Sequence, residues 1–305
     1  MSLDVNNRLY STMVDILETY VTNKDMKTQL YEFIDFKKEE GYLFGELVVL
    51  HYVIYNNKIE NHIFKVAAAI ELLILSFDIL DDIEDQDNLS SPWVQHQNLS
   101  LNISSYLLFL CQLIIKESDF KHKYIALELL ITKALRAIEG QHIDLLNNIS
   151  CEDRYIDMVV LKSGSLTELA CLIGTVLANP DKATEVQFYG SHIGVIGQIQ
   201  NDMEGMKCWD GKNDLLNKKW TLPILYLLAV EQNHPVIEKI QNYYNGSIEK
   251  HEILELAKVI ESLLEETGAF LYSKVTQQLY RNKAESSIMS LSITKKYKEA
   301  LLKYI

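Results

Sequence analysis

Proline and glycine are scarce in this chain. Its 305 residues contain four prolines and twelve glycines, and leucine, isoleucine, glutamate and lysine fill the long intervals between them. So few breaking residues exclude a chain of frequent turns, and the composition favours a mainly helical protein. The apolar share of 48% suffices for a sizeable core. No Gly/Ser linker, low-complexity tract or internal repeat marks a boundary, so the length allows one large domain or two.

Positive charge is also in short supply. The chain carries 29 Lys and Arg residues against 42 Asp and Glu residues, a net charge of −13. A general nucleic-acid binder needs a basic footprint for the phosphates, so we expect no nucleic-acid partner. A phosphorylated small molecule is not excluded, because it needs only local positive charge and metal.

Cysteine pairs and sorting signals are missing as well. The N-terminus has no charged-then-apolar signal pattern, and Glu71 and Asp78 interrupt the longest apolar run. No CxxC pair and no zinc-ligand spacing occurs, so we expect reduced thiols at Cys111, Cys151, Cys171 and Cys208. These features predict a soluble, cytoplasmic protein. The basic, amphipathic tail 295–303 is expected to be a solvated terminal helix, a lid, or a peripheral contact with the inner face of the cell membrane.

What the chain does have is an acidic cluster at the end of an apolar helix, predicted over residues 61–85. Asp78, Asp81 and Asp85 stand at i, i+3 and i+7 and share a helix face, with Asp82 roughly 100° around from Asp81. Like charges so close destabilise a helix unless a cation neutralises them. Magnesium, which takes carboxylates together with phosphate oxygens, suits this cluster. The alternative is an acidic helix end that faces water.

Further helices are predicted along the rest of the chain, with breaks near residues 22–25, 37–45, 86–98 and 179–181. Asp181 is expected to cap the helix that follows it. That helix contains Gly190, Gly194 and Gly197, which each weaken it by about 1 kcal/mol relative to alanine. Close packing against a neighbour or a ligand would explain these glycines.

A second polar cluster ends the glycine-containing helix. Gln198 and Asp202 share a face at i and i+4, with Asn201 beside them. If this end faced the first cluster, the two could hold magnesium against a diphosphate above an apolar cavity, with Lys162 and Lys219 as mobile positive charges. Taken singly, Lys162 suits a surface lysine and Asn201-Asp202 a helix cap.

From about residue 40 to 230 the chain resembles the trans-prenyltransferase (polyprenyl diphosphate synthase) family. Five segments match its motifs in order, namely the first aspartate-rich motif at Asp81–Asp85, G-Q-x-x-D-L at Gly140–Leu145, Lys-Thr at Lys162–Ser163, the second aspartate motif at Gly194–Asp202, and G-K…D-L…K-x-T-L-P at Gly211–Pro223. The resemblance implies an all-α, isoprenoid-synthase-like helical bundle around a central cavity. It further implies a single prenyltransferase domain over residues 1–305, dependence on Mg²⁺, and a homodimer.

The departures from the family pattern concern the acceptor side. Chain-elongating members carry G-K-R-x-R-P near the N-terminus to grip isopentenyl diphosphate, whereas residues 41–46 here read Gly-Tyr-Leu-Phe-Gly-Glu. Paired arginines after the first motif are replaced by Ser90-Ser91-Pro92, and the second motif lacks two of its usual three aspartates. Loss of several charge-assisted contacts, at roughly 1.5–3 kcal/mol each, removes the grip on a second diphosphate.

This pattern of departures is similar to that of the ComQ-type isoprenyl transferases of Bacillus and relatives. The resemblance implies a prenyltransferase that moves a geranyl or farnesyl group from its diphosphate to a tryptophan of a ComX-like precursor peptide, in quorum sensing and competence. Attack by indole C3 on the allylic carbon, and ring closure by a backbone amide nitrogen on C2, are implied in the same way.

The resemblance and the two clusters together assign the site. Metal binding is expected of Asp81, Asp82, Asp85, Asn201 and Asp202. The catalytic set is Asp81, Asp82, Lys162, Asp202 and Lys219. Substrate contacts are expected of Phe77, Gln141, Asp144, Lys162, Gln198, Lys212 and Lys219, with Phe77 as the floor of the hydrocarbon pocket or as a plain core residue. Glu204 is a candidate base, unless diphosphate takes the proton.

Three other readings compete. A terpene cyclase also opposes an aspartate motif to an Asn-Asp motif, but Gly205 and Trp209 stand where it usually has Ser/Thr and Glu. A non-catalytic partner subunit of a prenyl diphosphate synthase often loses its aspartates, which this chain keeps. The third is an elongating prenyl diphosphate synthase with an unusual acceptor site.

Overall fold

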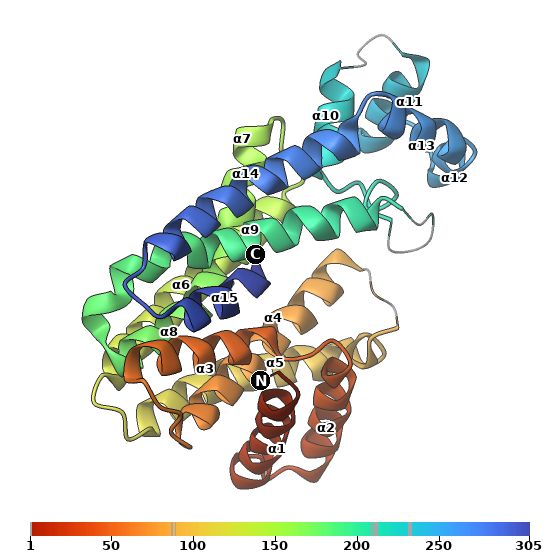
Figure 1. The fold of residues 1–305 in the computed structure, drawn as a ribbon. Helices are drawn as coiled ribbons and strands as arrows, with labels where there is room; N and C mark the ends of the chain where they lie inside the picture. The colour runs from red at the N-terminus through yellow and green to blue at the C-terminus, as the bar shows by residue number, and fades with distance from the viewer. Residues whose placement is uncertain (1, 87, 89, 208, 210–212, 231–233) are drawn as a thin grey trace.

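The computed structural model describes residues 2–86, 88, 90–207, 209, 213–230 and 234–305. All regular structure in those ranges is helical, which confirms the all-α prediction (Figure 1). The α-helices are α1 Ser2–Tyr20, α2 Lys24–Lys38, α3 Leu43–Asn56, α4 Ile63–Asp85, α5 Gln97–Glu117, α6 Lys123–Leu145, α7 Glu152–Val159, α8 Ser165–Ala178, α9 Ala183–Gly205, α10 Leu222–Val230, α11 Pro235–Tyr244, α12 Lys250–Leu254, α13 Ala257–Glu266, α14 Ala269–Ser290 and α15 Lys295–Leu301. Short 3-10 turns are η1 Pro92–Val94, η3 Pro180–Lys182 and η4 Leu302–Tyr304.

Helix α4 is buried along most of its length because its apolar residues occur on every face. Val66, Ala67, Ile70 and Leu73 are at most 1% exposed and lie in a core shared with α3, α5 and α8. The helix ends at Asp85 because Gln86 has a φ of 55°, in the left-handed region that stops helices. Its acidic residues therefore lie in its last two turns, at the edge of the core.

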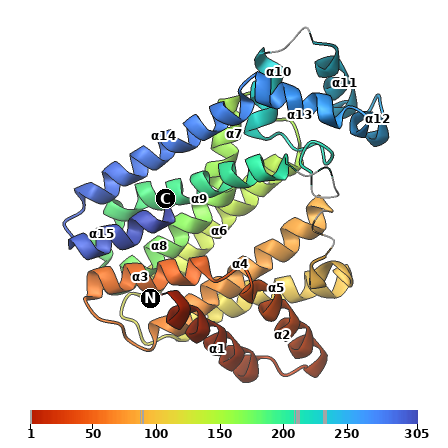
Figure 2. The ribbon, with the colours of Figure 1, turned by 45° about the vertical axis from the view of Figure 1, so that its right-hand side comes forward.

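Helices α4 and α9 deliver the two polar clusters to the same side of the bundle. Both helices end on the side where the loop after α9 leads to α10 (Figures 1 and 2). Residues of that loop and of α10 to α13, together with Ala269 at the start of α14, form a second apolar core. The C-terminal α15 lies against the bundle, and Leu301 is fully buried.

Between α7 and α8 the backbone makes a π-helical turn, η2 Val160–Gly164. Helix α7, the turn η2 and helix α8 thus follow one another without a break from Glu152 to Ala178. Such turns are uncommon and often lie at functional sites. Here the turn carries Lys162.

The expected cap at Asp181 is wrong. Asn179 caps the preceding 3-10 turn η3, since its side-chain oxygen accepts from the Asp181 backbone N–H at 3.2 Å. Helix α9 begins after that turn, and no side-chain hydrogen bond caps it. The side-chain cap therefore lies at the start of the 3-10 turn and not at the start of α9.

Two helical segments are long and apolar enough to cross a membrane, by length and composition alone: Gln97–Glu117 and Glu152–Ala178. In the second segment, 72% of the most apolar window is buried inside the bundle. Core helices of a bundle pass the same test, so the finding does not assign a membrane topology.

Candidate active site

The π-turn η2 is the point where three helices meet closely. A Cβ on Gly140 of α6 would lie 2.3 Å from the backbone nitrogen of Lys162. A Cβ on Gly194 of α9 would lie 2.4 Å from the carbonyl oxygen of Ser163. Only glycine permits these approaches, which explains two glycines that weaken their own helices. As a result, side chains from α6, α9 and η2 converge.

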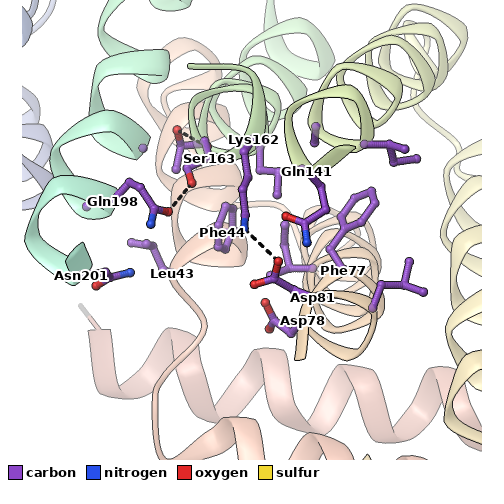
Figure 3. A pocket seen from close by; sticks show the side chains of 18 of the residues that line it. Leu43, Phe44, Phe77, Asp78, Asp81, Gln141, Lys162, Ser163, Gln198 and Asn201 are labelled. Carbon is purple, nitrogen blue, oxygen red and sulfur yellow. Dashed lines mark hydrogen bonds and ion pairs between the residues drawn. The ribbon is translucent and has the colours of Figure 1, made fainter. Parts of the chain in front are cut away.

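Lys162 is the charged centre of this convergence. Its Nζ lies 2.9 Å from Asp81 Oδ1 on α4 (Figure 3) and 2.8 Å from Asp144 Oδ2 on α6. Burial alone would lower the pKa of Lys162, but the charges of Asp81 and Asp144 outweigh it and hold this pKa above its usual value. The ammonium group therefore stays positive at the mouth of the site.

A second lysine forms an ion pair with α4, one helical turn after Asp81. Lys219, in the loop between α9 and α10, places its Nζ 2.8 Å from Asp85 Oδ2. Burial, followed by the charge of Asp81, raises the pKa of Asp85 above its ordinary value. Apart from these ammonium groups, no hydrogen-bond donor of the described residues reaches the buried oxygens Asp81 Oδ1 and Asp85 Oδ2.

Asp78 and Asp82 face other partners than Asp81 does. Asp78 Oδ2 pairs with Lys37 Nζ of α2 at 2.8 Å. Asp82 Oδ2 accepts three hydrogen bonds from the α4–α5 connection, from Asn88 Nδ2 at 3.0 Å, Ser91 Oγ at 3.0 Å and Trp93 Nε1 at 2.7 Å. The structure thus gives Asp82 a role in holding that connection, on a side of α4 different from that of Lys162.

On the opposite wall, Asp202 of α9 is buried and held by neutral donors. Tyr155 OH donates to its Oδ2 at 2.6 Å, and Gln198 Nε2 donates to its Oδ1 at 2.8 Å. Gln198 in turn accepts from Ser163 Oγ at 2.7 Å, which ties α9 to the π-turn. Burial raises the pKa of Asp202 to about 6, although both hydrogen bonds act to lower it. This carboxylate is fixed in place.

Two adjoining cavities lie between these walls. One of about 510 Å³ has largely apolar walls, including Phe44, Ile74, Phe77 and Ile193. A smaller one of about 210 Å³ is lined mainly by polar residues. They share Asp81, Lys162, Gln198 and Asn201, so a polar mouth opens onto an apolar chamber. The larger volume lies within the range of about 300–1,000 Å³ that is typical of small-molecule sites.

The predicted residues divide between this mouth and other places. Phe77 and Gln141 line the larger cavity, and Asp144, Asp202 and Lys219 line the smaller. Asp85 reaches the site through its ion pair with Lys219. Glu204 lines neither cavity; it is exposed and accepts a hydrogen bond from Gln200, so its assignment as base finds no support. Lys212 lies outside the described residues.

The donor set suits a divalent cation that keeps other ligands. Among the residues that the structure describes, no three His, Cys, Asp or Glu side chains are grouped so as to hold a metal by themselves. Magnesium commonly takes one or two protein carboxylates and completes its shell with water and phosphate oxygens. Asp81 and Asp85 fit that requirement, because lysine ammonium groups are the only partners that their buried oxygens Oδ1 and Oδ2 have among the described residues.

Two parts of the site were not predicted from the sequence. Tyr155 belongs to α7 and meets Asp202 only through the fold, so nothing near it in the chain signals its role. Leu43 and Phe44 entered the sequence analysis only because they stand where elongating relatives have basic residues. In the structure both line the larger cavity (Figure 3). Their apolar character was the available signal.

Known proteins share both this sequence pattern and this fold. Residues 42–261 match the family model described as polyprenyl synthetase. The chain is 33% identical over 287 residues to the tryptophan prenyltransferase ComQ of Bacillus spizizenii, covering 92% of this chain and 99% of that protein. It is 31% identical over 298 residues to ComQ of Bacillus subtilis (strain 168), covering 95% of each.

Solved structures of similar fold come from the same broad class. Geranylgeranyl pyrophosphate synthase from Lactobacillus brevis superposes with a TM-score of 0.82 at 17% identity, over 99% of this chain and 95% of that chain. A polyprenyl synthase from Caulobacter crescentus, complexed with calcium and isoprenyl diphosphate, gives 0.77 at 18% identity, over 99% and 92%. These similarities confirm the isoprenoid-synthase fold.

Proposed function

Since the chain belongs to the polyprenyl synthetase family, and within it to the ComQ group of tryptophan prenyltransferases, we propose that it transfers a geranyl or farnesyl group from its diphosphate to a tryptophan of a ComX-like precursor peptide. The observation that carries the proposal is the apolar wall of Leu43 and Phe44, beside a charged mouth that retains Asp81, Lys162 and Lys219.

The donor diphosphate is proposed to bind at the polar mouth. Lys162 and Lys219 supply positive charge there, and Asp81 and Asp85 would hold magnesium, which neutralises the charge that grows on diphosphate as its C–O bond breaks. Each of these aspartates forms an ion pair with a lysine in the structure, and a cation would take the place of that ammonium group. The prenyl chain would lie in the apolar chamber, against Phe77.

The acceptor is proposed to be an indole ring because the acceptor side is apolar. A second diphosphate would need several charged contacts, at roughly 1.5–3 kcal/mol each, and Leu43 and Phe44 provide none. An indole needs instead an apolar surface. In the proposed reaction the allylic C–O bond breaks and indole C3 supplies the electron pair of the new C–C bond. A backbone amide nitrogen then bonds to C2 and loses its proton to the released diphosphate or to water.

One experiment separates the proposal from its rivals. The protein is incubated with Mg²⁺ and farnesyl or geranyl diphosphate in three mixtures: alone, with isopentenyl diphosphate, or with a tryptophan-bearing precursor peptide. Mass spectrometry should show a prenyl adduct on the peptide and none when phenylalanine replaces its tryptophan. Formation of a longer prenyl diphosphate would identify an elongating synthase, and release of a hydrocarbon would identify a terpene cyclase. No turnover in any mixture would identify a non-catalytic partner subunit.

We also propose a homodimer. Helices α5 and α6 are adjacent and each carries a row of exposed apolar side chains, including Phe109 on α5, 73% exposed, and Leu135 on α6, 56% exposed. Covering such surface is favourable in water. Sedimentation should give a dimer, and Phe109→Asp should shift it toward monomer. A monomeric wild-type protein would contradict this part of the proposal.

The proposed location is the cytoplasm, with contact at the inner face of the membrane through the basic tail. The tail is a folded part of the bundle, because Leu301 is buried and Tyr304 OH donates to Glu46 Oε2 at 2.9 Å. Lys295, Lys296 and Lys303 remain exposed and would meet anionic headgroups. Sedimentation with anionic and with neutral vesicles tests this contact, and equal recovery from both contradicts it.

A further inference from the structure

Gly197 is a glycine that packing does not explain. It lies within α9, where glycine weakens a helix relative to alanine. A Cβ at Gly194, one turn earlier, would collide with Ser163 O at 2.4 Å, and a Cβ at Gly190 would lie 3.2 Å from Glu168 Cα. A Cβ at Gly197 would meet nothing within 4 Å. The missing side chain therefore leaves open space rather than permitting a close contact.

That space belongs to the larger cavity, next to its polar mouth. Gly197 lines this cavity, and its neighbour Gln198 and Asn201 one turn on line both cavities. Asn201 and Gln198 lie on one side in Figure 3, with Leu43 and Phe44 close to them and the Lys162–Asp81 ion pair beyond. A group beside Gly197 would thus lie near the place where the diphosphate is proposed to leave.

The residues around this space are suited to a flat apolar ring. Leu43 is the first residue of α3, and 41% of its surface is exposed, so it stands at the rim of the cavity. Phe44, which also lines this cavity, is partly buried. On the other side, Gly197 has no side chain, so a ring can lie flat against the backbone of α9. A side chain at this position would prevent that contact.

We propose that Gly197 and Leu43 form opposite walls of an acceptor subsite, which takes the indole ring of the substrate tryptophan beside the donor diphosphate. This inference rests on the proposed function and names the part of the cavity that recognises the acceptor. Gly197 is a specificity-determining position in this subsite, since any side chain there occupies the space of the ring. The donor chain lies instead toward Phe77.

The test fills the space in steps. Gly197→Ala and Gly197→Leu are compared with wild type by the KM and kcat for the precursor peptide, and by the calorimetric Kd of farnesyl thiodiphosphate, an unreactive donor analogue. Gly197→Leu should raise the peptide KM at least tenfold and Gly197→Ala less, while the donor Kd stays within twofold. Both variants should melt at or above the wild-type temperature, because glycine is replaced by a better helix former. Leu43→Ala should raise the peptide KM a few-fold.

Gln187→Leu is the matched control, since it places the same side chain on an exposed position of α9 that lines neither cavity. Unchanged peptide kinetics in Gly197→Leu would overturn the subsite. An equal loss of donor binding would also overturn it, because the space would then belong to the prenyl chain. If wild type modifies no tryptophan peptide, the proposed function itself fails, and the subsite with it.

Discussion

The two walls of the site hold their acidic groups in opposite ways. On α4, the buried oxygens Asp81 Oδ1 and Asp85 Oδ2 meet, within the described part of the chain, only the ammonium groups of Lys162 and Lys219. On α9, Asp202 is clamped by the neutral donors Tyr155 and Gln198. Lysines on long, flexible side chains can move away when a cation arrives, whereas a buried tyrosine cannot move without breaking the core.

This difference indicates that the two walls have different roles. The α4 wall is the one where charge can be exchanged, so it is the wall at which a cation and a diphosphate would be bound and released. The α9 wall is a fixed framework that connects Ser163, Gln198 and Asp202 in one hydrogen-bonded chain. The second aspartate motif, at the end of α9, has fewer aspartates than the family pattern. The one that remains, Asp202, is held by protein donors.

The largest effect is expected from the exchangeable wall. Asp81→Asn keeps the shape of the side chain but removes the charge that faces Lys162, so prenyl transfer should fall about 10²- to 10³-fold. The measurement is kcat/KM for the precursor peptide. Asp157→Asn, at an exposed position of α7 outside the site, serves as the control. Near-normal transfer by Asp81→Asn would remove the metal assignment from α4.

A smaller, pH-dependent effect is expected from the fixed wall. The pKa of Asp202 is about 6 in the folded chain against 3.8 as its ordinary value, so the folded chain binds the extra proton between these pH values and stability falls as pH rises through them. The Tyr155 hydrogen bond lowers this pKa. Tyr155→Phe should therefore extend the fall to higher pH and lower the free energy of unfolding at pH 8 by about 1–3 kcal/mol.

Urea unfolding in metal-free buffer at pH 5 to 8 measures this effect. Tyr10→Phe is the matched control, because Tyr10 OH also donates to an aspartate, Asp35, but at an exposed site. It should change stability little at any pH. If Tyr155→Phe and wild type show the same pH dependence, the clamp on Asp202 does not act as described.

The smallest effect on transfer is expected from Asp82, which neighbours Asp81 in sequence. In Asp82→Asn, the bonds from Asn88, Ser91 and Trp93 lose their charge assistance, which should lower the free energy of unfolding by about 1 kcal/mol. Transfer should stay within about tenfold of wild type, since the charge facing Lys162 remains. A loss equal to that of Asp81→Asn would show that Asp82 works with Asp81.

The helical periodicity of the sequence predicted much of the candidate site. The spacing of carboxylates on α4 and of Gln198 and Asp202 on α9 placed these groups on shared helix faces, and motif order placed Lys162 beside them. The difference between Asp81 and Asp82 was not predictable, because it depends on how Asn88, Ser91 and Trp93 lie against α4. Tyr155 was not predictable either, since 47 residues separate it from Asp202.

The glycines show the same limit. Gly190, Gly194 and Gly197 carry one signal in the sequence, and close packing or a ligand explains it equally well. Only the arrangement of helices separates them, because the first two lie against α8 and the π-turn while the third borders the cavity. Whether a glycine permits a close contact or leaves open space depends on the residues that surround it in the fold.

The most direct test of the account compares the two ligands that a prenyl diphosphate synthase would bind together. The charged mouth should bind a donor, and the apolar acceptor side should bind no second diphosphate. Titration calorimetry with Mg²⁺ should show farnesyl thiodiphosphate binding to the protein, lost when EDTA removes the metal, and no heat when isopentenyl diphosphate is added to the saturated complex. Specific, stoichiometric binding of isopentenyl diphosphate to that complex would contradict the account.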